Sequence, residues 1–158
     1  MKRMHFHVGV EYLESSISFY SALFAAPPAV RKSDYAKSIL DDPRVNFAIS
    51  TRGKRPGLDH LGIQVESHEE LQEVYARLHQ ASDNVIEQGK TACCYAQSKK
   101  SWIDDPAGIA WETFFTTGES TDYGDGTGER VARVAHESSC CAPQSSPAPE
   151  PASACCAG

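Results

Sequence analysis

The sequence predicts an α+β fold in which two βαβββ modules pair their sheets around a cleft. Three observations predict it: an alternating apolar segment occurs twice, a helical apolar period follows each copy, and an Asp-Asp-Pro motif precedes the last strand of each half. A helix followed by antiparallel hairpins, repeated twice, is typical of small α+β modules. We expect one domain over residues 1–118, with modules at about 1–52 and 56–118.

The first strand of each module alternates apolar and polar side chains. The two segments are residues 4–11 and residues 60–66, and each has apolar residues at every second position. Superposing them aligns His5 with His60, both on the face opposite the apolar stripe. A pseudo-twofold axis between the modules would bring these strands close together, so we expect both histidines to reach the cleft.

A helix is predicted after each first strand. Apolar residues recur there every three or four positions, which is the spacing of one helix face. Ser67 and Glu70 match a capping box at the start of the second helix. The apolar positions are Leu13, Ile17, Tyr20 and Phe24 in the first helix and Leu71, Val74 and Leu78 in the second.

The last strand of each module follows the Asp-Asp-Pro motif at residues 41–43 and at residues 104–106. Aligning the two strands places Ala48 of the first module at the position of Glu112 in the second. The first module therefore has no carboxylate where the second has one, which leaves that side of the cleft without a ligand.

Residues 119–158 have a different composition. They contain four of the nine prolines, many Ser and Ala residues, and −4 of the net charge of −6. Such a segment buries too little apolar surface to offset its ordering entropy. We predict a flexible tail rich in Pro, Ser, Ala and Cys.

Composition narrows the partners of the chain. A net charge of −6 argues against nucleic acid or an anionic membrane surface. No apolar run is long enough to cross a bilayer, and the N-terminus lacks the apolar region of a signal peptide. The cytoplasm is the expected location. The six cysteines, which form three adjacent pairs, are therefore expected as free thiols.

His5, His60 and Glu112 are the candidate metal ligands and catalytic residues. Two imidazoles and one carboxylate suit a ferrous or other divalent ion that keeps open coordination positions. A single strand histidine is more often structural, but the matched repeat position favours His5 and His60. His7 shares the face of His5 and is either the competing ligand or a residue that donates a hydrogen bond to a ligand.

The adjacent thiols of Cys93 and Cys94 suit a soft, thiophilic centre such as trivalent arsenic. Neighbouring side chains on a regular strand point to opposite faces, so joint binding requires a turn or a flexible loop. The surrounding residues 89–98 lack an apolar period and are interpreted as a loop. We expect this loop to act as a lid that also includes Tyr95 and Lys99.

Several segments together resemble a known family. They are MKRMHFHVGVEYLESSISFYSALF, DYAKSILDDPRVNFAIS, GLDHLGIQVES, TACCYAQSKKSWIDDPAGIAWETF and GESTDYGDG. The chain from residue 1 to about residue 124 resembles the arsenic- and cadmium-inducible branch of the vicinal oxygen chelate (glyoxalase/bleomycin-resistance/dioxygenase) superfamily. It is most similar to the organoarsenical carbon–arsenic lyases.

The resemblance implies paired βαβββ modules and a non-haem Fe(II) enzyme that requires dioxygen, with Ni, Co, Mn or Zn as substitutes for iron. Its substrates would be trivalent methyl and aromatic organoarsenicals, from which it would release arsenite for arsenic detoxification. The metal positions of the family map onto His5, His60 and Glu112, and its cysteine pair maps onto Cys93 and Cys94.

Two other functions remain open. A glyoxalase-like thiol transferase or isomerase would use Mn, Zn or Ni as a Lewis acid and would need no dioxygen. A non-catalytic protein that sequesters cadmium or arsenic would use all three cysteine pairs, including Cys140-Cys141 and Cys155-Cys156. Related folds exchange modules between subunits, so a homodimer is also open, as are the preferred arsenical and the order of oxygen attack.

Overall fold

The computed structural model describes residues 1–53, 55–93 and 95–119. Each half contains a strand, a helix and three strands, so the predicted α+β fold of two βαβββ modules is confirmed. The first half comprises β1 (Arg3–Gly9), α1 (Leu13–Leu23), β2 (Val30–Arg31), β3 (Tyr35–Asp41) and β4 (Arg44–Ser50). The second comprises β5 (Gly57–Val65), α2 (His68–Ala81), β6 (Ile86–Cys93), β7 (Ala96–Asp104) and β8 (Ala110–Glu119).

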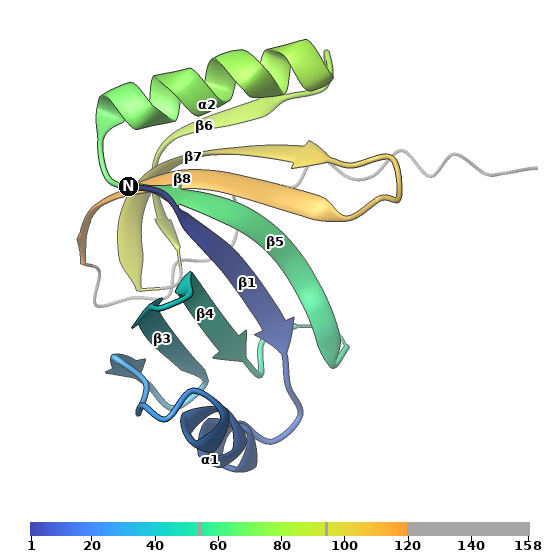
Figure 1. Cartoon of the computed structure of the whole chain (residues 1–158). Coiled ribbons are helices and arrows are strands. Elements are labelled where there is room, and N and C mark those ends of the chain that lie inside the picture. The colour runs from blue at the N-terminus through green and yellow to red at the C-terminus, as the bar shows by residue number, and fades with distance from the viewer. Residues whose placement is uncertain (54, 94, 120–158) are drawn as a thin grey trace, which may run out of the picture.

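All eight strands form one sheet in the order β2-β3-β4-β1-β5-β8-β7-β6. The first strands of the two halves, β1 and β5, pair antiparallel at its centre, as the repeat predicted. Each also pairs in parallel with the last strand of its own half, β1 with β4 and β5 with β8. Figure 1 shows the sheet curving, with α1 beside β3 and β4 and with α2 near β6 and β8.

The register preserves the internal duplication. His7 pairs with His60 across β1 and β5, and His5 pairs with Gly62. The repeat aligns His5 with His60 and His7 with Gly62. A twofold axis between the strands therefore converts the first of these pairs into the second. In this register His5 and His60 are diagonal neighbours across β1 and β5, where the two modules meet.

Each helix packs an apolar stripe against its own half of the sheet. The core cluster of the first half includes Leu13 and Ile17 of α1, and that of the second includes Leu71 and Val74 of α2, as predicted. With the helices covering one face, the polar side chains of β1, β5 and β8 are left to the other face. The apolar core therefore lies on one face of the sheet and the candidate site on the other.

The start of α2 has the predicted cap. Ser67 Oγ accepts a hydrogen bond from the backbone N–H of Glu70 at 3.2 Å. The Glu70 carboxylate accepts from the backbone N–H of Glu66 at 2.9 Å, one residue earlier than in a standard capping box. The first of these bonds satisfies an N–H group that the first turn of a helix leaves unpaired.

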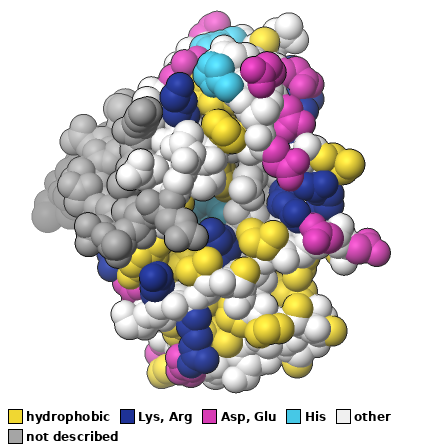
Figure 2. Space-filling view, turned by 90° about the vertical axis from the view of Figure 1, so that its left-hand side faces the viewer, with side chains coloured by type: hydrophobic (Ala, Val, Ile, Leu, Met, Phe, Trp, Pro, Cys, Tyr) yellow, Lys and Arg dark blue, Asp and Glu magenta, His cyan; other side chains and the backbone are white. Residues whose placement is uncertain are grey.

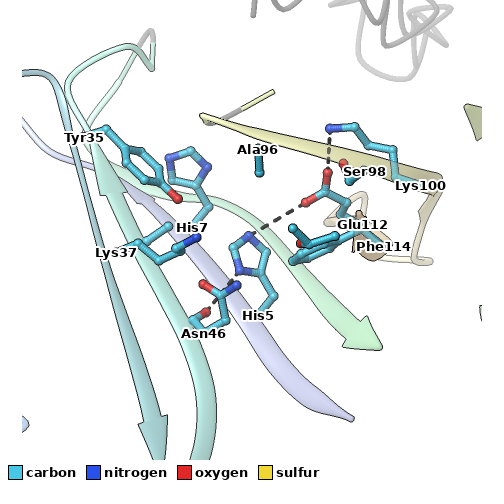
Figure 3. Close-up of a pocket in the computed structure, with 12 residues that line it drawn as sticks. His5, His7, Tyr35, Lys37, Asn46, Ala96, Ser98, Lys100, Glu112 and Phe114 are labelled. Carbon is cyan, nitrogen blue, oxygen red and sulfur yellow. Dashed lines mark hydrogen bonds and ion pairs between the residues drawn. The ribbon is translucent and has the colours of Figure 1, made fainter. Parts of the chain in front are cut away.

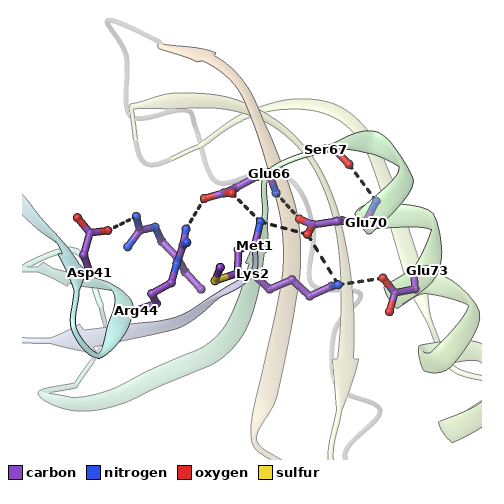
Figure 4. A network of polar contacts seen from close by, with 9 residues as sticks. Met1, Lys2, Asp41, Arg44, Glu66, Ser67, Glu70 and Glu73 are labelled. Atoms are coloured by element: carbon purple, nitrogen blue, oxygen red, sulfur yellow. Dashed lines mark hydrogen bonds and ion pairs between the residues drawn. The ribbon is translucent and has the colours of Figure 1, made fainter.

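Charged side chains join the N-terminus to the second half (Figure 4). The amino group of Met1 lies 2.6 Å from Glu66 and 3.2 Å from Glu70, and Lys2 lies 2.9 Å from Glu73. Exposed ion pairs each contribute little to stability, about 0–1 kcal/mol. Here they join residues 1 and 2, which precede β1, to the start of α2 and the residues just before it.

The predicted loop around the adjacent cysteines is wrong over most of its length. β6 continues to Cys93 and β7 begins at Ala96, so residues 89–93 and 96–98 belong to two paired strands. Pairing with β7 supplies backbone hydrogen bonds to β6 without any apolar period, because β6 is an edge strand. Cys94 and the predicted tail beyond Glu119 lie outside the described residues. Within the described ranges, no helix is long and apolar enough to span a membrane.

Candidate metal centre

Three side chains from three strands converge on the inner face of the sheet. His5 of β1, His60 of β5 and Glu112 of β8 are all buried. His5 Nε2 lies 3.2 Å from His60 Nε2 and 3.8 Å from Glu112 Oε2, and His60 Nε2 lies 3.4 Å from Glu112 Oε2. All three come from one chain, so the cluster is complete without an exchanged module.

The spacing of these atoms fits one metal ion. Bonds of about 2.1 Å place ligand atoms about 3.0 Å apart at right angles and about 3.4 Å apart in a tetrahedron. The observed separations of 3.2, 3.4 and 3.8 Å need only small side-chain movements to meet this condition. The chemistry of the donors, two imidazoles and a carboxylate, suits a divalent ion with open positions.

Hydrogen bonds orient both imidazoles. His5 Nδ1 donates to the backbone oxygen of Asn46 at 3.1 Å, which leaves the lone pair of Nε2 toward the cluster. His60 Nδ1 donates to Asp59 Oδ2 at 2.8 Å and turns its own Nε2 the same way. Such outer partners fix the tautomer of a metal-binding histidine and raise its basicity.

Burial and neighbouring charges have opposing effects on the pKa values of the three side chains. Burial lowers the pKa of His5 to about 4. Burial also opposes the charge on His60, but hydrogen bonds with Asp59 and Glu112 outweigh it and raise the pKa of His60 to about 9. Burial opposes ionisation of Glu112 too, yet the hydrogen bond from His60 and the charge of Lys100 hold the pKa of its carboxyl well below the usual range. In the absence of a metal ion these shifts favour a carboxylate at Glu112, a neutral His5 and a protonated His60, so a cation that binds the cluster must displace the proton from His60.

Lys100 of β7 orients the carboxylate. Its ammonium group donates to Glu112 Oε1 at 2.9 Å, and it is only 4% exposed. The contact leaves the other oxygen, Oε2, toward the two histidines. Lys99, the lysine predicted for the lid, precedes Lys100 in the chain. It lies on the opposite face of β7, because neighbouring side chains on a strand point to alternate faces.

His7 lies beside the cluster and contacts other groups. Its Nε2 shares a hydrogen bond of 2.9 Å with the hydroxyl of Ser50. Its Nδ1 is 3.8 Å from Asp59 Oδ2 and has no hydrogen-bond partner within the described ranges. His7, Asp59 and His60 could also hold an ion, but the geometry places His5, and not His7, next to both His60 and Glu112. Burial, followed by the charge of His60, lowers the pKa of His7 to about 3.

A pocket opens next to the cluster and is lined by both modules. Figure 2 shows a central hollow on this face, with histidine and a basic side chain visible within it. Ala48 lies in its wall where the second module has Glu112, which leaves room beside the cluster. The lining residues are His5, His7, Tyr35, Lys37, Asn46, Ala48, Ala96, Ser98, Lys100, Glu112, Phe114 and Thr116. Most of them are labelled in Figure 3.

The β6–β7 hairpin brings Cys93 to the rim of this pocket. Cys93, the last residue of β6, pairs with Ala96, which lines the pocket. Tyr95 between the strands has a φ of 61° and donates from its hydroxyl to Asp34 Oδ1 at 2.8 Å. The Lys32 ammonium lies 5.1 Å from the centre of its ring. The hairpin of the second module is thus held against the first module.

Replacing Tyr95 by phenylalanine is expected to loosen this contact. The variant loses the hydrogen bond to Asp34, which contributes about 0.5–1.5 kcal/mol. We predict a rise of a few-fold in the KM for a thiol-binding substrate with unchanged metal content, because the metal cluster does not contact Tyr95. Steady-state kinetics with metal analysis checks this. Metal loss with an unchanged KM would contradict it.

Gly62 allows β5 and β8 to approach each other at Glu112. A Cβ at residue 62 would lie 2.3 Å from the backbone oxygen of Glu112. We predict that Gly62→Ala lowers the free energy of unfolding by about 2–4 kcal/mol and weakens metal binding, because the strand bearing Glu112 must move. At Gly118, which lies in β8 with Glu112, an added Cβ meets nothing within 4 Å, so Gly118→Ala is the matched control. Urea unfolding of both variants checks this; equal stability would contradict it.

Comparison with known proteins agrees with this architecture. Residues 3–113 match the model of the Glyoxalase/Bleomycin resistance protein/Dioxygenase superfamily. The chain belongs to this superfamily. Solved structures support the fold: an extradiol ring-cleaving dioxygenase from B. fuscum superposes with a TM-score of 0.54 at 15% identity, over 74% of this chain and 33% of that one. A Mn(II)-bound glyoxalase from Novosphingobium aromaticivorans gives 0.51 at 14% identity, over 79% and 44%.

Relatives within the superfamily confirm the branch that the sequence resembles. A protein called trivalent organoarsenical cleaving enzyme, from Bacillus sp. (strain MD1), is 44% identical over 122 residues, which are 73% of this chain and 74% of the relative. The protein of that name from Thermomonospora curvata is 32% identical, over 92% of both chains. Cadmium-induced protein CadI of Mycobacterium tuberculosis is 33% identical over 142 residues, which are 89% and 93%.

Proposed function

We propose that this protein cleaves the carbon–arsenic bond of trivalent methyl and aromatic organoarsenicals in an Fe(II)- and dioxygen-dependent reaction that releases arsenite. The observation that carries the proposal is the cluster of His5, His60 and Glu112 within 3.2–3.8 Å of one another, beside a pocket with Cys93 at its rim. The names of the relatives support the same substrate class. We place the reaction in the cytoplasm, where thiols remain reduced.

His5, His60 and Glu112 would hold the iron. A ferrous ion with two imidazoles and one carboxylate keeps positions open and supplies dioxygen chemistry when bound. Asn46 and Asp59 hold the imidazoles by their outer nitrogens, and Lys100 holds the carboxylate by its outer oxygen. These contacts fix the donor atoms before the ion arrives, which lowers the cost of ordering them.

The thiolates of Cys93 and Cys94 would bind the arsenic. Trivalent arsenic is a soft centre that takes two sulfur ligands in exchange for its hydroxyls. Its carbon substituent then enters the pocket toward the metal cluster. Fixing both reactants on one scaffold supplies proximity, an effect that can reach about 7–11 kcal/mol in the best cases.

The overall reaction balances for the methyl substrate. One methylarsenite and one dioxygen together contain the atoms of one arsenous acid and one formaldehyde. The dioxygen is reduced while the methyl carbon is oxidised, so this stoichiometry needs no further reductant. An aryl group that leaves as a phenol requires two further electrons and two protons, which a thiol reductant would supply as two thiols form a disulfide.

Anaerobic iron loading, followed by air and methylarsenite, tests the proposal through arsenic speciation of the products. We expect arsenite only when both iron and dioxygen are present. Turnover without dioxygen would favour the thiol transferase or isomerase. Binding of arsenic or cadmium in fixed proportion to cysteine pairs, without any arsenite, would favour the sequestering protein.

A further inference from the structure

Asn46 presents a buried hydrogen-bond acceptor to the pocket. The residue is 3% exposed, and its Nδ2 donates to Gln64 Oε1 at 2.8 Å. Its Oδ1 has no hydrogen-bond partner within the described ranges, although Asn46 lines the pocket. Buried side-chain oxygens are nearly always paired, so an unpaired one that lines a pocket indicates a group supplied by a ligand.

The position of Asn46 brings that acceptor next to the metal cluster. Asn46 pairs with His5 across β4 and β1, and its backbone oxygen accepts the hydrogen bond from His5. Lys37 on β3 pairs with Ala48, so Lys37 and Asn46 are diagonal neighbours on one face of the sheet. Figure 3 shows both beside His5, on the side of the pocket away from Glu112.

The remaining walls suit an aromatic ring. Phe114 lies edge-on to His5 at a centroid distance of 5.1 Å, and Tyr35 closes the side next to Lys37. Aromatic faces and edges favour stacking against another ring. A ring between Phe114 and the first module would direct its far end toward Asn46 and Lys37.

We propose that Asn46 and Lys37 select aromatic arsenites with a hydroxyl or amino substituent on the ring. The substituent donates a hydrogen bond to Asn46 Oδ1, and a hydroxyl also accepts one from the Lys37 ammonium. Asn46 and Lys37 are then specificity-determining residues that touch the substrate away from the reacting bond. This inference rests on the proposed function, and it narrows the substrate class that the function leaves open.

The test compares para-hydroxyphenylarsenite with para-methylphenylarsenite, which has a methyl group of similar size. We expect the wild type to favour the hydroxyl compound in kcat/KM by about tenfold, the effect of one hydrogen bond to an otherwise unpaired buried group. Asn46→Leu should reduce the ratio to about one. Asn46→Asp, which keeps an acceptor oxygen on a side chain of the same shape, should retain the preference.

Anaerobic calorimetry of the same two compounds on the iron-free protein gives a second readout that does not require turnover. The same ratio is expected in the dissociation constants. A wild type without preference, or an Asn46→Leu variant that keeps it, overturns the inference while cleavage of both compounds leaves the proposed function intact. A preference in binding without any cleavage upholds the inference and rejects the function.

Discussion

Glu112→Gln should abolish metal binding and lower the free energy of unfolding of the metal-free protein by about 3 kcal/mol. The loss of metal follows because glutamine offers no anionic oxygen to complete the ligand set. The loss of stability follows because the Lys100 ammonium, only 4% exposed, remains buried without its carboxylate. Metal analysis after dialysis and urea unfolding measure the two effects separately.

The double variant Glu112→Gln with Lys100→Met separates them further. Removing the buried cation should restore most of the lost stability, because no charge is then left unpaired, while metal binding stays lost. Lys100→Met alone should weaken metal binding by about 10–100-fold, the usual effect of losing an outer partner of a ligand. A Glu112→Gln variant that still binds one equivalent of iron would contradict the role of Glu112.

Cys93→Ser and Cys94→Ser should each lower turnover of methylarsenite by about a thousandfold or more, with iron binding unchanged. A single thiolate holds arsenic too weakly and too loosely to keep its carbon at the metal, so most of the proximity effect disappears. Turnover by arsenic speciation and iron content by metal analysis measure the two quantities on the same samples.

The matched controls are Cys140→Ser and Cys141→Ser, which change an adjacent pair in the predicted tail. These variants should retain full turnover. Retained activity in both the Cys93 and the Cys94 variant would refute the dithiolate. A fall in arsenic-binding capacity on removing the tail, without any product in the parent, would instead support sequestration.

The sequence predicted both the duplicated fold and the three clustered residues, because both depend on the alternation of apolar residues and on the internal repeat. Alternation in the first strands fixed the face of His5 and His60, and the repeat aligned them. The same alignment equated Ala48 with Glu112, and the parallel pairs His7 with Ala48 and Gly62 with Glu112 agree with it. Strand register alone therefore accounts for this part of the site.

Other parts of the site depend on pairing that no local pattern encodes. The choice of Lys100 over Lys99 as the partner of Glu112 follows from the registry of β7 on β8, which shifts between Gln97 and Ser98. The carboxylate of Asp59, adjacent to His60 in the sequence, could have been predicted to accept a hydrogen bond from the imidazole. The acceptor of Asn46 becomes notable only when its burial and its lack of a partner are known.

X-ray absorption at the iron and arsenic edges tests most sharply whether two sulfurs hold the arsenic next to an iron that carries no sulfur ligand. The sample is the anaerobic, iron-loaded protein with methylarsenite, in a variant whose four cysteines in residues 119–158 are serine. We expect arsenic bonded to two sulfurs and one carbon, and iron bonded only to nitrogen and oxygen. Arsenic without sulfur neighbours, or sulfur bonded to the iron, would contradict it.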